Sequence, residues 1–477
     1  MGAMDHDTSS APGRRPRRRA GRARRVLIVC VAGGAVLGGA LVLVADRDGG
    51  APPPVPGPAA AARGAVAAGA PAALSGLAAL IGDGEARVRE RPGDGEAWAV
   101  LGAAYVERGR RTADAADWPR AERALRTALE TGAARDPGAL ESLAALAVAR
   151  RDFAEARTWG ERAAGRGPKR WTAQAVLIDA YTGLGDHEAA GKALDRMLEL
   201  RPGLPAVRAR AAAVYRDRGW REDAEAQVAD AAAAAGTPAE RAAYLEQAGR
   251  LAFERGDREK ALRYAREALR AGPDRAQARA GEARALAALG RTEEAVSAYR
   301  AAYAARPDAE YARELGELFA SLGRGREAAE QGERVRERVR QAEAAGADGS
   351  LVLGLAEADH GDAEAAVERL RAEWGRQPST EVADALGWAL HRAGRDEEAL
   401  GFAVTATDGT RGGGVRSALY AFHRGMVERE LGLVGPARRR LEEALRINPY
   451  FSPLHAPAAR EALDGLGGPP LGSPPPL

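Results

Sequence analysis

The chain is poor in cysteine and lysine, and each shortage narrows what it can be. Cys30 is the single cysteine among 477 residues, so an intrachain disulfide and a four-cysteine zinc site are both excluded. No small residues directly precede Cys30, so we interpret it as an apolar residue of a membrane helix rather than a lipidated cysteine. Lysine occurs three times only, and the basic charge is therefore almost all arginine, as expected of a high-GC bacterium.

Motifs that carry common enzyme chemistry are also absent. The sequence has no GxxxxGK[ST], no GxSxG and no HExxH, and its six histidines are scattered. The densest polar cluster is Glu357, Asp359, His360 and Asp362, which surround Gly361. We interpret that cluster as turn chemistry rather than a metal site. We therefore predict no catalytic residue, no cofactor and no metal, and a protein that is not an enzyme.

The positive charge of the chain is concentrated at one end. Residues 1–25 hold eight arginines and two aspartates, a net charge of +6, whereas the whole chain carries +3. The remaining residues therefore carry −3. A slightly acidic body provides no positive field for nucleic acid, and no nucleic-acid partner is expected.

Residues 26–45 form an uncharged run next to the arginines. Twenty residues of helix span about 30 Å, the thickness of the apolar part of a bilayer. Because positive flanks stay in the cytoplasm, we predict a single-pass membrane helix, a cytoplasmic tail at 1–25 and an extracytoplasmic body. A cleaved signal peptide, which would release a secreted protein, is the alternative. A twin-arginine export signal is a weaker alternative.

Proline, alanine and glycine dominate residues 46–70, which include the segment APPPVPGP. Such a composition cannot bury a core, so we expect an extended linker there. The end of the chain, 467–477, is also rich in proline and is expected to be disordered.

An alanine recurs through the body at intervals of 33 to 38 residues. The recurring positions are Ala121, Ala156, Ala190, Ala224, Ala261, Ala295, Ala328, Ala366, Ala399 and Ala437. Each interval contains one helix–turn–helix pattern. A fixed period near 34 residues predicts an all-α solenoid, because each unit needs its neighbours to cover its apolar face.

The segment 171–202 shows the pattern most plainly. Leu177, Ile178 and Tyr181 share one face of a first helix, and Gly185 ends it. The small Ala190 then allows the second helix to approach the first closely.

These residues resemble the tetratricopeptide repeat family. The first repeat matches the family pattern at Trp98, Leu101, Gly102, Tyr105, Gly109, Ala121, Leu125 and Ala128. The resemblance implies a right-handed α-solenoid of about ten repeats over 95–449. We expect capping helices at 71–94 and 450–466, and a concave groove that binds a protein or a peptide.

The resemblance also indicates which side chains face the groove. In the earlier repeats these slots hold small or charged residues: Ala99, Ala103, Glu107, Ala206, Ala209, Ala213, Asp217, Glu246, Arg250, Glu254 and, as an exception, Phe253. The last two repeats supply Asp384 and Glu430 together with the predicted partner-binding residues Trp388, His391, Arg392, Phe422, Met426 and Arg429. Aromatic, methionine and arginine residues are common in binding hot spots. For Trp388 and Phe422, packing in the core against the neighbouring repeat or the capping helix is the alternative, and it is favoured over a position in the groove. The Lys and Asn pairs with which some family members hold a terminal carboxylate are absent.

Three functions follow from this organisation. The favoured one is a non-catalytic, membrane-anchored scaffold that binds a peptide or partner protein in its groove. The alternative is an accessory subunit of a membrane transport or secretion complex that docks through the convex face, where Trp159 and Trp374 are placed. An enzyme or a sugar-binding protein is the least favoured, and no small-molecule substrate is identified.

Overall fold

A computed structural model describes residues 56–133, 135–409 and 414–467. The described residues belong to one compact unit, Pro56–Leu477. They fold into helices, with no strand among them. The predicted membrane helix at 26–45, the basic tail at 1–25 and most of the predicted disordered end lie outside the described residues. Within them, no helix combines the length and the apolar character that crossing a membrane requires.

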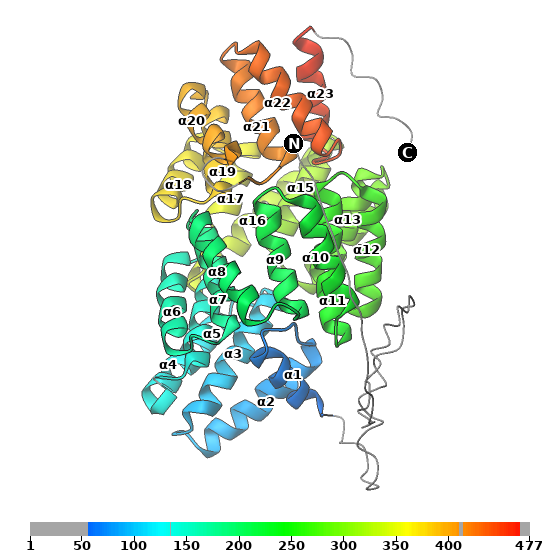
Figure 1. Cartoon of the computed structure of the whole chain (residues 1–477). Coiled ribbons are helices and arrows are strands. Elements are labelled where there is room, and N and C mark those ends of the chain that lie inside the picture. The colour runs from blue at the N-terminus through cyan, green and yellow to red at the C-terminus, as the bar shows by residue number, and fades with distance from the viewer. Residues whose placement is uncertain (1–55, 134, 410–413, 468–477) are drawn as a thin grey trace, which may run out of the picture. The chain divides into compact units, whose positions relative to one another are not determined.

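Ten antiparallel helix pairs make up most of the described chain (Figure 1). The first helices of the pairs are α3 (Gly95–Thr112), α5 (Pro137–Ala149), α7 (Trp171–Gly183), α9 (Pro205–Asp217), α11 (Pro238–Glu254), α13 (Ala276–Ala288), α15 (Ala309–Ser321), α17 (Ser350–His360), α19 (Thr380–Arg392) and α21 (Ala418–Glu430). The second helices are α4 (Asp117–Ala128, continued by a short π-helix, Leu129–Ala133), α6 (Phe153–Arg166), α8 (His187–Leu200), α10 (Arg221–Ala233), α12 (Arg258–Ala271), α14 (Thr292–Ala305), α16 (Gly325–Ala344), α18 (Ala363–Arg376), α20 (Asp396–Thr407) and α22 (Val434–Ile447). Helices α1 (Pro58–Ala67) and α2 (Leu74–Glu90) precede the pairs, and α23 (His455–Gly465) follows them.

The recurring alanine occupies the same place in every pair. Each one lies in the second helix, and nine of the ten are at most 2% exposed. Ala328 is the partly buried exception, in the longer helix α16. The predicted turns are present too: Gly185 adopts φ +73°, and the Asp186 side chain then caps α8 by accepting from the amide of Ala189. The repeat organisation predicted from the alanines is confirmed.

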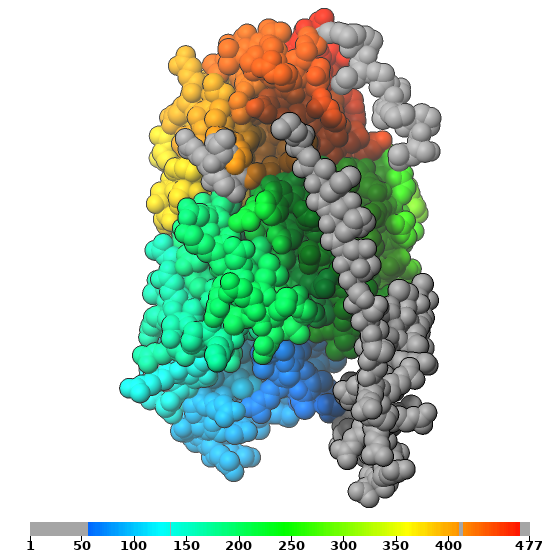
Figure 2. Space-filling model, viewed as in Figure 1, coloured from blue at the N-terminus to red at the C-terminus, as the bar shows by residue number. Residues whose placement is uncertain are grey.

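Repeats far apart in the sequence also contact one another. The Gln377 amide donates to the carbonyl of Arg151 at 2.7 Å, and His187 Nε2 lies 3.0 Å from Thr380 Oγ1. Asn448 donates in the same way to the carbonyl of Phe253 at 2.8 Å. These partners are 193 to 226 residues apart. The pairs therefore wind into a superhelix in which later repeats pack against earlier ones. The earlier and the later repeats together form one continuous surface (Figure 2).

Part of the predicted linker is a helix instead. Residues 58–67 form α1, which lies against α2 and α3. Pro58 suits the first helical position, and the alanines after it have the highest helix propensity. Gly76 of α2 allows close approach, because a Cβ there would lie 3.2 Å from the Ala62 Cβ. The composition rule for linkers was wrong at 58–67 because it neglects the helix propensity of alanine when a neighbouring helix is available.

The two ends of the array are covered by helices. At the N-terminal end, α2 packs on α3 inside the segment where a cap was predicted. At the C-terminal end, α23 packs on α21 and α22. Both helices bury an apolar face that the terminal repeat would otherwise expose to water.

Candidate functional site

The first helices of the early repeats line a cavity of about 1320 Å³. Most of its wall is formed by α1, α3, α5, α7, α9 and α11 and by the start of α13, with single residues from α2 and α4 and part of the short π-helix. We call this the first-turn cavity. Drug-sized ligands occupy pockets of about 300–1,000 Å³, so this space is large enough for a segment of polymer.

Small side chains at the predicted groove slots create this space. The alanine residues among these slots that line it are Ala99, Ala103, Ala206, Ala209 and Ala213. A methyl group at each slot leaves room that a larger side chain would fill.

The charged slots divide into two groups. Glu107, Glu246 and Arg250 line the cavity as predicted. Asp217 and Glu254 do not, and neither does the predicted slot Phe253. Both carboxylates bind Arg216, Glu254 with two hydrogen bonds of 2.8 and 2.9 Å and Asp217 at 2.9 Å.

Ion pairs join successive repeats along the cavity wall. Arg170, just before α7, binds Glu141 of α5 at 2.7 Å, and Arg275, just before α13, binds Glu246 of α11 at 2.5 Å. Both pairs are 29 residues apart, so they occupy equivalent places in two repeats. Gln277 and Arg306 also line the cavity, and Arg306 binds Asp308 at 3.0 Å. The Oε1 of Gln277 and the Nε of Arg306 have no hydrogen-bond partner among the described residues.

The lining of the cavity is positive, whereas the body of the chain is slightly negative. Eight arginines line it against five carboxylates. All five carboxylates already have partners in the structure: Glu96 with Arg63, Glu107 with Arg110, Glu141 with Arg170, Glu246 with Arg275, and Asp136 with the backbone amides that it caps. Arg250 forms no hydrogen bond or ion pair within the described residues.

Two guanidinium groups are buried at the cavity wall. Arg111 and Arg275 are 7% and 8% exposed, although they come from α3 and from the start of α13. Burial lowers the pKa of Arg111, and the positive charge of Arg275 lowers it further. The Tyr244 hydroxyl on α11 and, separately, Nη1 of Arg275 are buried without a hydrogen-bond partner among the described residues.

The N-terminal segment passes along the same cavity. Arg63 and Val66 of α1 line it, as do the residues 69–71 that follow. Gly69 lies against Trp171 of α7, and Arg111 donates to the carbonyl of Ala72. The segment thus joins the first repeats to α7 across one side of the cavity.

Aromatic side chains fill the interior of the last repeats instead. Trp388 of α19 and Phe422 of α21 are 5% and 2% exposed, with ring centroids 5.7 Å apart. Trp388 stacks on His423 with centroids 4.2 Å apart, and Phe422 lies 5.1 Å from the His455 ring of α23. We call these four residues with Asp359 the C-terminal interior.

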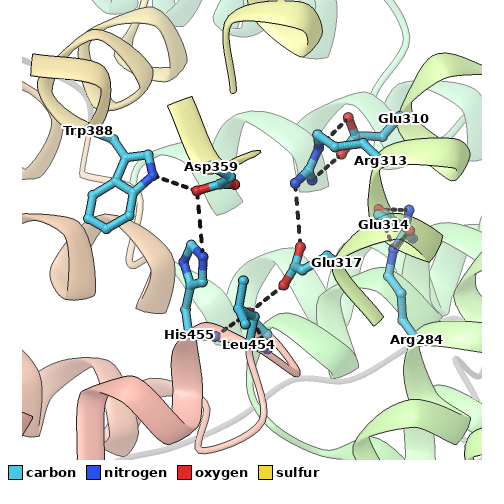
Figure 3. A network of polar contacts seen from close by, with 10 residues as sticks. Arg284, Glu310, Arg313, Glu314, Glu317, Asp359, Trp388, Leu454 and His455 are labelled. Atoms are coloured by element: carbon cyan, nitrogen blue, oxygen red, sulfur yellow. Dashed lines mark hydrogen bonds and ion pairs between the residues drawn. The ribbon is translucent and has the colours of Figure 1, made fainter. Parts of the chain in front are cut away.

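Polar contacts tie this interior to the cap and to α15 (Figure 3). Trp388 Nε1 donates to Asp359 at 2.8 Å, and His455 Nε2 lies 3.7 Å from the same carboxylate. The Ser452 hydroxyl donates to Glu317, which Arg313 also contacts at 3.4 Å. Burial lowers the pKa of His455, although Asp359 opposes this effect.

The six residues predicted to bind a partner do not form one surface. Trp388 and Phe422 lie in the core, which is the alternative that the sequence left open. His391 Nδ1 lies 2.5 Å from Asp396, and Arg392 is exposed with its Nε donating to the carbonyl of Ala358. The remaining two are Met426, which packs partly buried against the core, and Arg429, which is exposed. Partner binding by these six stays a prediction, but the two aromatic anchors would first have to leave the core.

Two other sequence features have packing roles. Trp159 is partly buried, donates to Glu155 at 3.0 Å and lies under the guanidinium of Arg162. Trp374 packs edge-on against Phe402. In the polar cluster around Gly361, the acidic side chains point to different partners: Glu357 to Arg369, Asp359 to Trp388, and Asp362 to the N-terminus of α18.

Comparison with known proteins places the repeats in a family. The model of the tetratricopeptide repeat matches residues 107–170, 161–205, 246–310 and 281–348. No functionally curated protein matches the chain in sequence.

Solved structures resemble the chain as follows. PilF of Pseudomonas aeruginosa is 18% identical in sequence, and its match covers 43% of this chain and 93% of PilF, with a TM-score of 0.35. For a thermophilic TPR protein of Thermus thermophilus the identity is 24%, the match covers 36% of this chain and 92% of that protein, and the TM-score is 0.33. In the same order of identity, share of this chain, share of the other chain and TM-score, a third structure compares with it as follows. For the Cut9–Hcn1 complex of the APC/C they are 14%, 78%, 76% and 0.39. Matches at this level indicate no partner or activity for this chain. Tetratricopeptide repeats are thus detected at 107–205 and 246–348, and helix pairs continue on both sides of these stretches.

Proposed function

We propose that this chain is a non-catalytic scaffold that binds a segment of a partner protein in the first-turn cavity. The observation that carries the proposal is the cavity itself, about 1320 Å³ in volume and lined by first-helix residues of successive repeats. Arrays of this family are protein-interaction modules, and their first helices supply the contact residues. These observations favour a binding region in the early repeats over one in the last two.

The proposal includes attachment to a membrane through residues 26–45. Its support is the uncharged run of 20 residues beside eight arginines. Attachment would raise the effective concentration of a second membrane-bound partner near the cavity. Fractionation of the full chain, with and without residues 1–45, tests it. Recovery of the full chain in the soluble fraction would contradict the anchor, and a shortened full-chain product would indicate signal cleavage.

Photocrosslinking tests the binding region. A photoreactive phenylalanine analogue replaces Ala209 in the cavity wall or, as a control, Arg326 on α16, whose side chain is 91% exposed. We expect a crosslinked protein from the Ala209 position that is missing from the Arg326 position. Ala103→Trp, which narrows the cavity, should abolish that product while the helical circular dichroism is unchanged. A product formed equally from both positions would move the binding region out of the cavity.

A further inference from the structure

We propose that residues 58–72 are a removable strap over the first-turn cavity, and that a helix of the partner takes their place when it binds. The strap comprises α1 and the five residues that follow it. This inference rests on the proposed function and adds its regulation. The chain itself closes one side of its binding region until a partner competes for that place.

The strap lies on the concave side of the early repeats. A Cβ on Gly69 would lie 3.1 Å from the ring of Trp171 on α7, and Arg111 of α3 donates to the carbonyl of Ala72. Six strap residues line the same cavity as α3, α7 and α11: Arg63, Val66, Ala67, Gly69, Ala70 and Pro71. The strap therefore occupies space beside the first helices that a ligand would otherwise reach.

Capping of the array does not explain this position. Helix α2 packs directly on α3, and it buries Leu77, Leu80, Ile81 and Val88. Helix α1 buries one residue, Ala62. The apolar end of the first repeat is thus already covered by α2, and α1 is an addition that extends over the cavity.

The strap is also held weakly. Helix α1 has ten residues, no side chain caps its N-terminus, and its first turn contains no acidic residue. Its ion pair joins Arg63 to Glu96 at 3.2 Å, but the two side chains are 43% and 76% exposed, so the pair stabilises little. The hydrogen bond from the buried Arg111 holds the strap at Ala72. The strap can therefore leave the cavity while its end stays attached.

The place that the strap leaves defines the kind of partner. Ala65 and Val66 pack against the apolar cluster that contains Leu77 of α2, so their departure uncovers apolar surface. At Gly76 of α2 a Cβ would lie 3.2 Å from the Ala62 Cβ, so a replacing helix needs alanine or glycine there. Leucines at the places of Ala65 and Val66 would bury more apolar surface than the strap does. An amphipathic helix with one small residue facing Gly76 meets these conditions.

Hydrogen exchange of the full chain, in detergent if the anchor requires it, tests whether the strap opens without a partner. We expect the amides of α1 to exchange about a hundredfold faster than those of α3, because α1 opens locally while the array stays folded. Helix α2 is the internal control and should be protected like α3. Equal protection of α1 and α2 would overturn the removable strap.

A disulfide tests the competition with the partner. Ala62→Cys with Gly76→Cys places two Cβ atoms close to the usual span of roughly 3.5–4.5 Å, and Cys30→Ala removes the native thiol. The closed loop from 62 to 76 contains every strap residue that lines the cavity. We expect oxidation to slow exchange in α1 and to reduce the Ala209 crosslink at least about fivefold, and reduction to restore both.

The matched control is Ala62→Cys in the Cys30→Ala background, treated with the same oxidant, which should crosslink normally. A product from Ala209 that forms equally in the oxidised and the reduced double variant would show that the strap is a fixed part of the wall, and the proposal would be overturned while the scaffold function stands. If the reduced chain gives no product from Ala209, the proposed function fails and the competition fails with it. Exchange in α1 still decides whether the strap opens.

Discussion

The early and late repeats share one fold, but the early repeats enclose an open cavity and the late repeats a filled core. In the early repeats, alanines at the first-helix slots leave the first-turn cavity open. In the last repeats, Trp388 and Phe422 occupy such slots and fill the interior, with His455 of α23 packed against them. Side-chain size at a few slots therefore decides whether a repeat contributes a binding surface or a core. The four predictions that follow test this difference, from the largest expected effect to the smallest.

Truncation of Trp388 should have the largest effect. Trp388→Ala removes a buried ring that contacts Phe422 and His423, so we expect the free energy of unfolding to fall by about 3–5 kcal/mol. Trp220→Ala is the matched control, because Trp220 is 48% exposed and its loss should cost about 0.5 kcal/mol or less. Urea denaturation measures both. Similar losses would mean that the late interior is not packed as described.

Contact between early and late repeats can be broken at a single glycine. Gly185 has φ +73°, and a Cβ there would lie 2.3 Å from the carbonyl oxygen of Pro378. Gly323 has φ +70° at the equivalent turn, with no atom within 4 Å of such a Cβ. Both alanine variants should lose about 1–2 kcal/mol from the left-handed backbone, and Gly185→Ala a further 1–3 kcal/mol or so from the collision. Equal melting temperatures for the two variants would argue against the contact.

Two adjacent alanines of α3 distinguish cavity from core within one helix. Ala104 is fully buried, whereas Ala103 lines the cavity. Ala104→Leu should therefore destabilise the protein by about 1–3 kcal/mol through overpacking, and Ala103→Leu by about 0.5 kcal/mol at most. Thermal unfolding of the pair measures the difference. The reverse order would show that the register of α3 is wrong.

The smallest expected effect is a dependence on pH. Burial lowers the pKa of His455 below its usual value of about 6.5, so the unfolded chain binds a proton more readily than the folded one. The stability from neutral His455 is present above about pH 6.5 and is lost as the pH falls toward the folded pKa. His455→Gln should therefore reduce the loss of Tm between pH 7.5 and 5.5 by about 1–2 °C.

His187 provides the comparison for the early repeats. Burial lowers its pKa as well, and it lies beside Thr380 at the contact between early and late repeats. His187→Gln should give a shift of the same sign. Asp359 affects stability in another pH range. Its pKa is lowered, so the stability that its ionised carboxylate contributes is lost only below about pH 4. A Tm of the wild type that stays constant from pH 7.5 to 5.5 would contradict both histidine predictions.

The repeat organisation could be predicted from sequence, because each unit is specified locally. Ala190 and Gly185 determine how one helix approaches and turns into the next, and both kinds of position repeat down the chain. Most groove slots of the early repeats, such as Ala99, Ala103 and Ala209, line the cavity as the register predicted, but Asp217, Phe253 and Glu254 do not.

The nature of the site could not be predicted in the same way. Trp388 and Phe422 were candidate anchors for a partner because aromatic residues suit one, with core packing as the favoured alternative, and His455 from the cap packs against them. The ion pairs of the cavity wall, Glu141 with Arg170 and Glu246 with Arg275, were not predicted either. The two members of each pair lie in different repeats, so their contact is a property of the packed structure. The fixed spacing of 29 residues between Glu246 and Arg275, and again between Glu141 and Arg170, was the one signal that the sequence offered.

The contacts between repeats some 200 residues apart have a consequence for folding. In an ordinary solenoid each repeat contacts only its neighbours, so one repeat can unfold locally without disturbing distant ones. Here the Gln377 side chain donates to the carbonyl of Arg151, and the Asn448 side chain donates to the carbonyl of Phe253. Removal of the last repeats would therefore take hydrogen-bond donors away from carbonyls in earlier repeats. Truncation from either end should therefore not subtract repeats one at a time. The array is instead expected to unfold with the cooperativity of a globular domain, although its sequence is repetitive.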